Sequence, residues 1–106
     1  MKVVCVGHST YDTTLPMDFY PTENLKYRIQ EHMECGGGPA ANGAYLLAKW
    51  GMDTTIMCAV GDDYYGQQVI HEFERVHAST ECIEVHPNFM TSSSYIIANR
   101  SNGSRT

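Results

Sequence analysis

Short runs of apolar residues alternate along this chain with two stretches in which apolar residues return at helical spacing. The runs cover residues 2–7, 54–61 and 81–85, and each has the length of a typical strand. The first run is almost wholly apolar and ends at Gly7, which predicts a strand buried on both faces of a parallel sheet.

Two helices are predicted between these strands. The first stops at Gly51 and the second covers residues 64–76. Their apolar faces are formed by two sets of residues, namely Ala40, Ala44, Leu47 and Ala48, and Tyr65, Val69, Phe73 and Val76. Strands that alternate with helices indicate an α/β fold with a parallel sheet and flanking helices.

The end of the chain predicts one further strand and a turn. Residues 91–99 read as a strand, and residues 101–104 as a hairpin turn that contains the favoured Asn-Gly pair. Arg105 then begins a return strand.

A run of three glycines, Gly36 to Gly38, precedes the first helix. Glycines are costly inside regular elements, so we expect a loop whose backbone closely approaches another group. Pro39 suits the first helical turn, and a helix N-terminus behind such a loop favours hydroxyls or anions. The alternative is a tight strand-to-helix turn that binds nothing. The spacing matches neither a phosphate-binding loop nor a dinucleotide fingerprint.

Between the first strand and the glycines the pattern changes to alternation. Residues 25–30 alternate apolar and polar positions, which predicts a half-exposed strand. Residues 13–19 are expected to pair with it as an irregular or edge strand, because Pro16 interrupts them. A plain surface hairpin and a lid over a ligand are both compatible with this stretch.

Two adjacent carboxylates, Asp62 and Asp63, stand just before the second helix. They allow metal binding or acid–base chemistry, but the helix that follows needs a cap, so capping is the favoured interpretation.

The composition indicates which classes of protein are compatible with this sequence. The 106 residues carry a net charge of −5 and four separated cysteines, which suits a small cytoplasmic domain with reduced thiols. The absence of a basic cluster argues against a nucleic-acid partner, and no apolar run is long enough to cross a membrane.

The residues Gly37 to Ala44, followed by Gly51 and then Gly61, resemble the first signature of the ribokinase-like (PfkB) carbohydrate kinases, spacing included. The resemblance implies a Rossmann-like parallel sheet of the ribokinase type. It also implies a small β-sheet lid built from about residues 13–33 and 91–106. The implied reaction is phosphoryl transfer from ATP to a sugar hydroxyl.

The resemblance also implies a set of substrate-binding residues, which are Asp12, Gly37, Gly38, Asn42 and Arg105. Asp12 would receive sugar hydroxyls, and Arg105 would lie near the sugar or the transferred phosphate. From residue type alone, Asp12 is expected to cap a turn. For Arg105 the alternative is a charged side chain in solvent that binds nothing. Some family members carry Asn at the position of Thr10, so the sugar contacts are expected to differ there.

The resemblance implies no catalytic residue and no metal ligand within this chain. Family members carry their base in a C-terminal Asp-Thr-x-Gly-Ala-Gly-Asp signature, which these 106 residues lack. We therefore expect a fragment, about the first third of such a kinase, that does not turn over alone. ATP and Mg²⁺ would serve the full-length protein, without tight binding to this chain. The expected partners are a small sugar, of a kind left open, and a second copy through the lid strands. A non-catalytic α/β oligomerisation or interaction module is the alternative.

Overall fold

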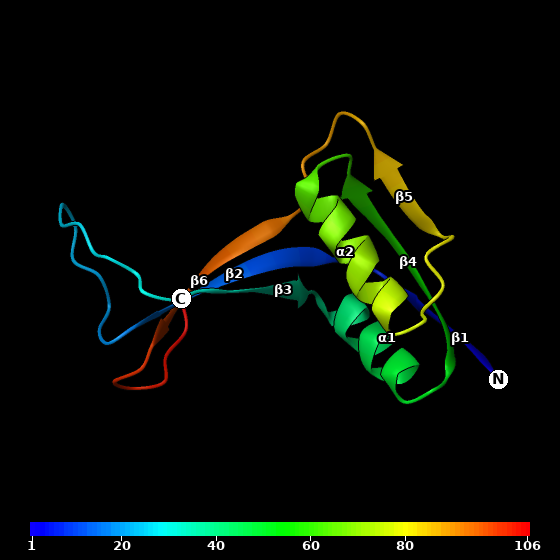
Figure 1. Cartoon of the computed structure of the whole chain (residues 1–106), viewed down its shortest axis with the longest axis horizontal. Coiled ribbons are helices and arrows are strands. Elements are labelled where there is room, and N and C mark those ends of the chain that lie inside the picture. Colours follow the sequence, from blue (N-terminus) through cyan, green and yellow to red (C-terminus); the bar gives the residue numbers. More distant parts are fainter.

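The computed structural model describes all residues 1–106. The elements follow in the order β1 (Lys2–Val6), β2 (Thr10–Met17), β3 (Met33–Gly37), α1 (Pro39–Lys49), β4 (Asp53–Gly61), α2 (Tyr64–Arg75), β5 (Ile83–His86) and β6 (Ser93–Asn99). They form two three-stranded sheets, in the orders β1-β4-β5 and β3-β2-β6. The second sheet extends away from the helices, so the molecule measures 50 × 33 × 20 Å (Figure 1).

The first sheet is parallel throughout, as the alternation of strands and helices predicts. Its inner face carries Ile56, Cys58 and Val60 of β4, which form one core with residues of α1 and α2. Ile56 is completely buried, and Val69 and Phe73 of α2 are only 1% and 3% exposed. The predicted apolar face of α2 is confirmed. The small side chains Ala44 and Ala48 let α1 lie close to the strands as predicted, but the third residue that α1 buries is Ala41, while the predicted Leu47 is not part of the core.

The prediction that β1 is buried on both faces is wrong. Val4 and Val6 are 50% and 66% exposed, and Met57 beside Val6 is 43% exposed. Both helices pack on the opposite face, where β4 buries Ile56, so these three side chains lie outside the core. The apolar run of β1 resembles that of a fully buried strand, but only one of its sides is buried here.

The second sheet is mixed. β2 lies in the middle, antiparallel to β3 and parallel to β6. The expected strand at residues 25–30 is wrong, because these residues form no regular element and the partner of β2 is β3. Leu25 is 63% exposed, so this apolar side chain of the alternating stretch does not pack against a core. Pro16 is tolerated in β2 because pairing with β3 ends at Thr14, which leaves that side free of ladder bonds.

The expected turn near the end of the chain is confirmed. Arg105 forms an antiparallel bridge with Ala98, and the backbones of Ile97 and Thr106 bond in both directions. Gly103 takes a φ of 74°, as the hairpin turn requires.

The expected cap of α2 is also confirmed. Asp63 Oδ1 accepts the Gly66 N–H at 2.8 Å, and both carboxylate oxygens accept from Thr91, whose hydroxyl in turn accepts the Gly61 N–H. These hydrogen bonds, chiefly those from Thr91, hold the pKa of Asp63 below its ordinary value. The network ties the start of α2 to the segment that enters β6. Neither helix is long and apolar enough to span a membrane.

Candidate functional site

Three neighbours from three different segments enclose the glycine run. A Cβ at Gly36 would meet the Glu72 carboxylate of α2, whereas one at Gly37 would meet the Asp12 carboxylate of β2. Gly38 has a φ of 98°, and its missing Cβ would collide with the His8 carbonyl oxygen. The expectation of a loop is wrong for Gly36 and Gly37, which end strand β3. The expected close approach of backbone to other groups is present at all three glycines.

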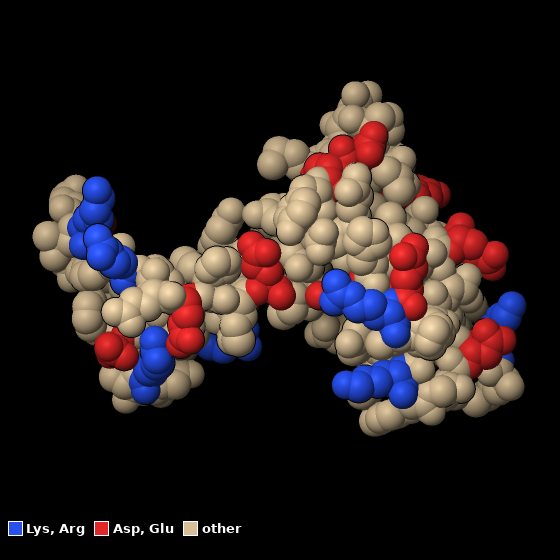
Figure 2. All heavy atoms as spheres, in the orientation of Figure 1, with Lys and Arg blue, Asp and Glu red and all other residues tan.

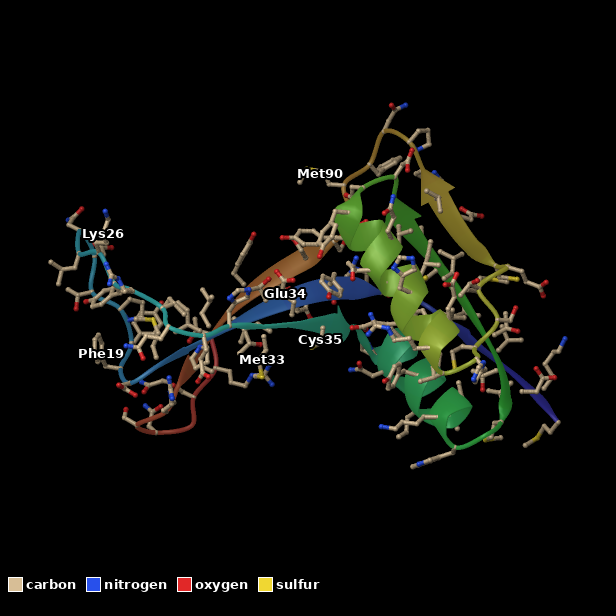
Figure 3. The ribbon with its side chains drawn as sticks, in the orientation of Figure 1. Phe19, Lys26, Met33, Glu34, Cys35 and Met90 are labelled. Atoms are coloured by element: carbon tan, nitrogen blue, oxygen red, sulfur yellow. The ribbon has the colours of Figure 1, made fainter.

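The two faces of β3 meet different parts of the molecule. Successive residues of a strand point to opposite faces, so Gly36 faces α2 while Gly37 faces away from it. On the α2 face, the Tyr11 ring lies 5.6 Å from that of Tyr65. Glu34 points to the same side, whereas Met33 and Cys35 lie on the opposite side of the ribbon (Figure 3). Asp12 thus belongs to the face turned away from α2.

Asp12 and Thr10 form a small polar cradle over Gly37. Thr10 lies directly opposite Gly37 in the register, and Asp12 lies opposite Cys35. A Cβ at Gly37 would come within 2.8 Å of Thr10 Oγ1 and 3.2 Å of Asp12 Cγ. The absence of that Cβ is therefore what makes room for both polar side chains.

The cradle contains buried polar atoms without hydrogen-bond partners. Thr10 Oγ1 and Asp12 Oδ1 are buried and unpaired. Ser9 Oγ is unpaired as well, but Ser9 lines a pocket between α1 and α2 and adjoins the Cys58 thiol, which is only a weak hydrogen-bonding group. An unpaired buried polar group costs about 1–3 kcal/mol, so the two in the cradle mark a place suited to an external hydrogen-bonding ligand.

Asn42 lies in the first turn of α1, on the other side of the glycines. Its backbone N–H donates to the Gly38 carbonyl at 2.8 Å, and its side chain is exposed. It lines a pocket of about 240 Å³ between α1 and α2, together with Gly36, Tyr45 and Glu72 among others. Asp12 does not line this pocket. The structure thus brings both predicted residues to the glycine run, but that they grip one diol stays a prediction.

Arg105 is exposed and takes part in no ion pair. Burial, then the Glu72 and Asp12 carboxylates, raise the pKa of the Cys35 thiol, and Arg105 opposes this rise. The guanidinium is therefore within electrostatic range of the strand that carries the glycines. Lys26, by contrast, lies at the outer tip of the loop between β2 and β3, far from Cys35 (Figure 3).

Charges are distributed without a strong patch of one sign. On the face shown in Figure 2, Lys and Arg side chains lie in small separate groups, several of them beside Asp or Glu. Arg100, for example, lies 3.7 Å from Asp18 and 3.6 Å from Glu31. No group of three or more His, Cys, Asp or Glu side chains gathers closely enough to hold a metal ion.

Sequence reasoning placed the polar stretch of residues 8–12 near a ligand, but it did not single out Ser9, did not predict that Thr10 is buried in a cradle, and missed Glu72. The polar stretch after β1 was the signal for Ser9 and Thr10, since ligands of α/β sheets gather at the carboxyl ends of strands. Glu72 carries no such signal, because its carboxylate reaches Gly36 only through the packing of α2 on β3.

The arrangement supplies complementary hydrogen-bonding groups. Asp12 Oδ1 accepts and Thr10 Oγ1 both donates and accepts, and neither atom has a partner within the chain. The first turn of α1 has no acidic residue and no side-chain cap, so its free N–H groups favour electron-rich atoms. A polyhydroxylated ligand matches this mixture better than an apolar one.

Comparison with known proteins gives concordant results. The profile of the pfkB family carbohydrate kinases matches residues 1–106. An ATP-dependent ribose-1-phosphate kinase of Halopiger xanaduensis is 29% identical over 97 residues, which cover 92% of this chain and 33% of the relative. The ribokinase of Staphylococcus aureus is 27% identical over 99 residues, covering 92% and 33% respectively.

Solved structures agree on the fold. The ribokinase of Arabidopsis thaliana, in complex with ribose and ATP, superposes with a TM-score of 0.85 at 20% identity, covering 99% of this chain and 34% of that one. The nucleoside kinase of Methanocaldococcus jannaschii does so with a TM-score of 0.83 at 21% identity, covering 99% and 35%. The fold is therefore of the ribokinase type, as expected. The chain spans about a third of the length of these relatives.

Proposed function

Since the chain belongs to the pfkB family of carbohydrate kinases, we propose that it is the acceptor-binding part of an ATP-dependent sugar kinase. The observation that carries this proposal is the pair of buried, unpaired oxygens, Thr10 Oγ1 and Asp12 Oδ1, beside the glycine floor. A sugar hydroxyl is both donor and acceptor, so it satisfies either atom.

Each group has a separate task in this proposal. Asp12 accepts the hydrogens of sugar hydroxyls and thereby orients the ring. Thr10 contacts a neighbouring hydroxyl with its own, and Gly37, by lacking a Cβ, leaves room for the Asp12 and Thr10 side chains, while Gly38 lets the chain turn past His8 into α1. Asn42, at the first turn of α1, donates and accepts through its amide, which suits one side of a diol. Correct orientation of the acceptor accounts for much of the catalysis of phosphoryl transfer.

The second sheet acts as a lid in this proposal. Residues 13–33 and 91–106 contain most of β2 and the whole of β6, which project beyond the helices (Figure 1). Such a lid excludes water, which would otherwise compete with the sugar for the phosphoryl group. Arg105, near the end of the hairpin, would balance negative charge at the lid's inner side. ATP supplies the phosphoryl group, which the sugar hydroxyl accepts.

Titration of the 106-residue chain tests the proposal. Calorimetry with D-ribose, D-fructose and uridine should find binding for at least one of them, weakened about tenfold or more in Asp12→Ala by loss of a charged hydrogen bond. Asp62→Ala is the matched control, because Asp62 is exposed and its side chain makes no hydrogen bond. A coupled ATP assay of the same chain should show no turnover. Equal weakening by both variants, or no binding of any probe, would refute the acceptor site.

A second candidate, a non-catalytic module that associates with its own copy, has one observation in its favour. Strand β3 pairs with β2 alone, so its outer edge is open, and Met33 is 60% exposed. Open edges of this kind promote pairing between copies. Dimers that form with rising concentration and are lost in Met33→Lys would support this function, whereas sugar binding by a monomer would favour the kinase.

A further inference from the structure

Glu72 makes the only side-chain hydrogen bond between α2 and β3. Its Oε2 accepts the backbone N–H of Gly36 at 2.9 Å, although the two residues are separated by 36 positions. Because β3 is an edge strand, this N–H has no partner in a neighbouring strand. The carboxylate thus takes the place of a missing strand at one point of the edge.

The contact fixes the glycine run from the side opposite to the cradle. Glu72 presses on Gly36 from the α2 face, and Asp12 lies over Gly37 from the other face. A Cβ at position 36 would displace the Glu72 carboxylate from this contact. The backbone between the two carboxylates is therefore held between a helix and a strand.

Glu72 is also reachable from solvent. It is half-buried and lines the pocket of about 240 Å³ between α1 and α2. No Lys, Arg or His forms an ion pair with it. No positively charged side chain therefore competes with the Gly36 N–H for the Glu72 carboxylate.

We propose that Glu72 is a positioning residue, whose bond to Gly36 holds Gly37 in place beneath Asp12 and Thr10. The proposal rests on the proposed acceptor site, since the position of the Gly37 backbone affects binding only if a ligand binds beside it. Glu72 reaches Gly36 from the α2 side of β3, whereas Asp12 and Thr10 lie beside Gly37. Through its hydrogen bond, Glu72 fixes the position of the β3 backbone relative to Asp12 and Thr10.

Amide hydrogen exchange of the 106-residue chain, read by NMR, tests the contact without any ligand. In Glu72→Ala the Gly36 amide should exchange about tenfold faster or more, as expected for loss of a hydrogen bond to a charged acceptor. Amides in β4, such as those of Ile56 and Val60, should be unchanged. Glu72→Gln keeps an acceptor oxygen and should restore most of the protection. Glu74→Ala, an exposed glutamate on the same helix, is the control and should leave Gly36 unchanged.

Titration of the same four proteins with D-ribose, D-fructose and uridine then separates the possible results. For a probe that the wild-type chain binds, positioning predicts weaker binding in Glu72→Ala, partial recovery in Glu72→Gln and no effect of Glu74→Ala. Unchanged exchange at Gly36, equal acceleration at Ile56, or undiminished binding of that probe in Glu72→Ala would each overturn it. Absence of binding of all three probes by the wild-type chain, with the Gly36 effect intact, would instead refute the acceptor site and leave the contact established.

Discussion

Replacement of Gly37 by Ala should separate folding from binding in this chain. The new Cβ would meet the Asp12 carboxylate and come within 2.8 Å of Thr10 Oγ1. Both groups are the ends of side chains, so they can turn aside while the backbone of β3 stays in register. An off-rotamer side chain costs about 1 kcal/mol, and Ala in place of Gly recovers about 0.4–1 kcal/mol from the unfolded state.

The expected change in the free energy of unfolding is therefore small, within about 1 kcal/mol in either direction. Ligand binding should suffer far more, because Asp12 no longer points into the cradle. A lost hydrogen bond to a charged acceptor weakens affinity by about 1.5–3 kcal/mol, which is roughly 10- to 150-fold. Urea unfolding and calorimetric titration with D-ribose measure the two quantities on the same sample.

Gly43→Ala is the matched control for this substitution. Gly43 lies inside α1 with nothing within 4 Å of its missing Cβ, so Ala there should stabilise the chain by up to about 1 kcal/mol. Its affinity for the sugar should stay unchanged. If Gly37→Ala bound D-ribose as tightly as Gly43→Ala, Asp12 would not be a sugar ligand and the cradle would be a packing feature.

Four further predictions concern Gly38, the Asp63 cap of α2 and Arg105. Gly38→Ala should destabilise by about 3 kcal/mol or more in urea unfolding, because a left-handed φ and a rigid His8 carbonyl both exclude a Cβ. Asp63→Ala should lower stability by about 2 kcal/mol by removing the cap and the bonds from Thr91. Since folding lowers the pKa of Asp63, its contribution is complete above about pH 4 and disappears as acid titrates the folded carboxylate, so acid unfolding should start at higher pH in Thr91→Val. Arg105→Gln should leave the melting temperature unchanged, since the side chain makes no ion pair, but weaken D-ribose or phosphate binding in titration.

Much of the fold follows from local pattern. The strands of the parallel sheet and both helices were predictable because each buries one apolar set against the same core, as Ile56, Ala44 and Phe73 do. The role of Asp63 was predictable too, since capping depends on residues three or fewer positions away.

The errors arise where tertiary contacts override local preference. Gly36 and Gly37 end a strand despite their conformational cost, because the Glu72 and Asp12 carboxylates occupy the positions that a Cβ would take. Leu25 belongs to an alternating stretch that meets no core, so its pattern did not become a strand. Val4 looks like a residue of a fully buried strand, but helices cover only the other face of its sheet.

The most direct test of the acceptor site is an NMR titration of the 106-residue chain with D-ribose, D-fructose and uridine. The proposed site predicts that, for at least one of these probes, the amides of Thr10, Asp12 and Gly37 shift with a single saturation curve. In Asp12→Ala the same shifts should require about tenfold more ligand or more. Saturable shifts that avoid these three residues, or that persist unchanged in Asp12→Ala, would contradict the assignment of the cradle as a sugar-binding site.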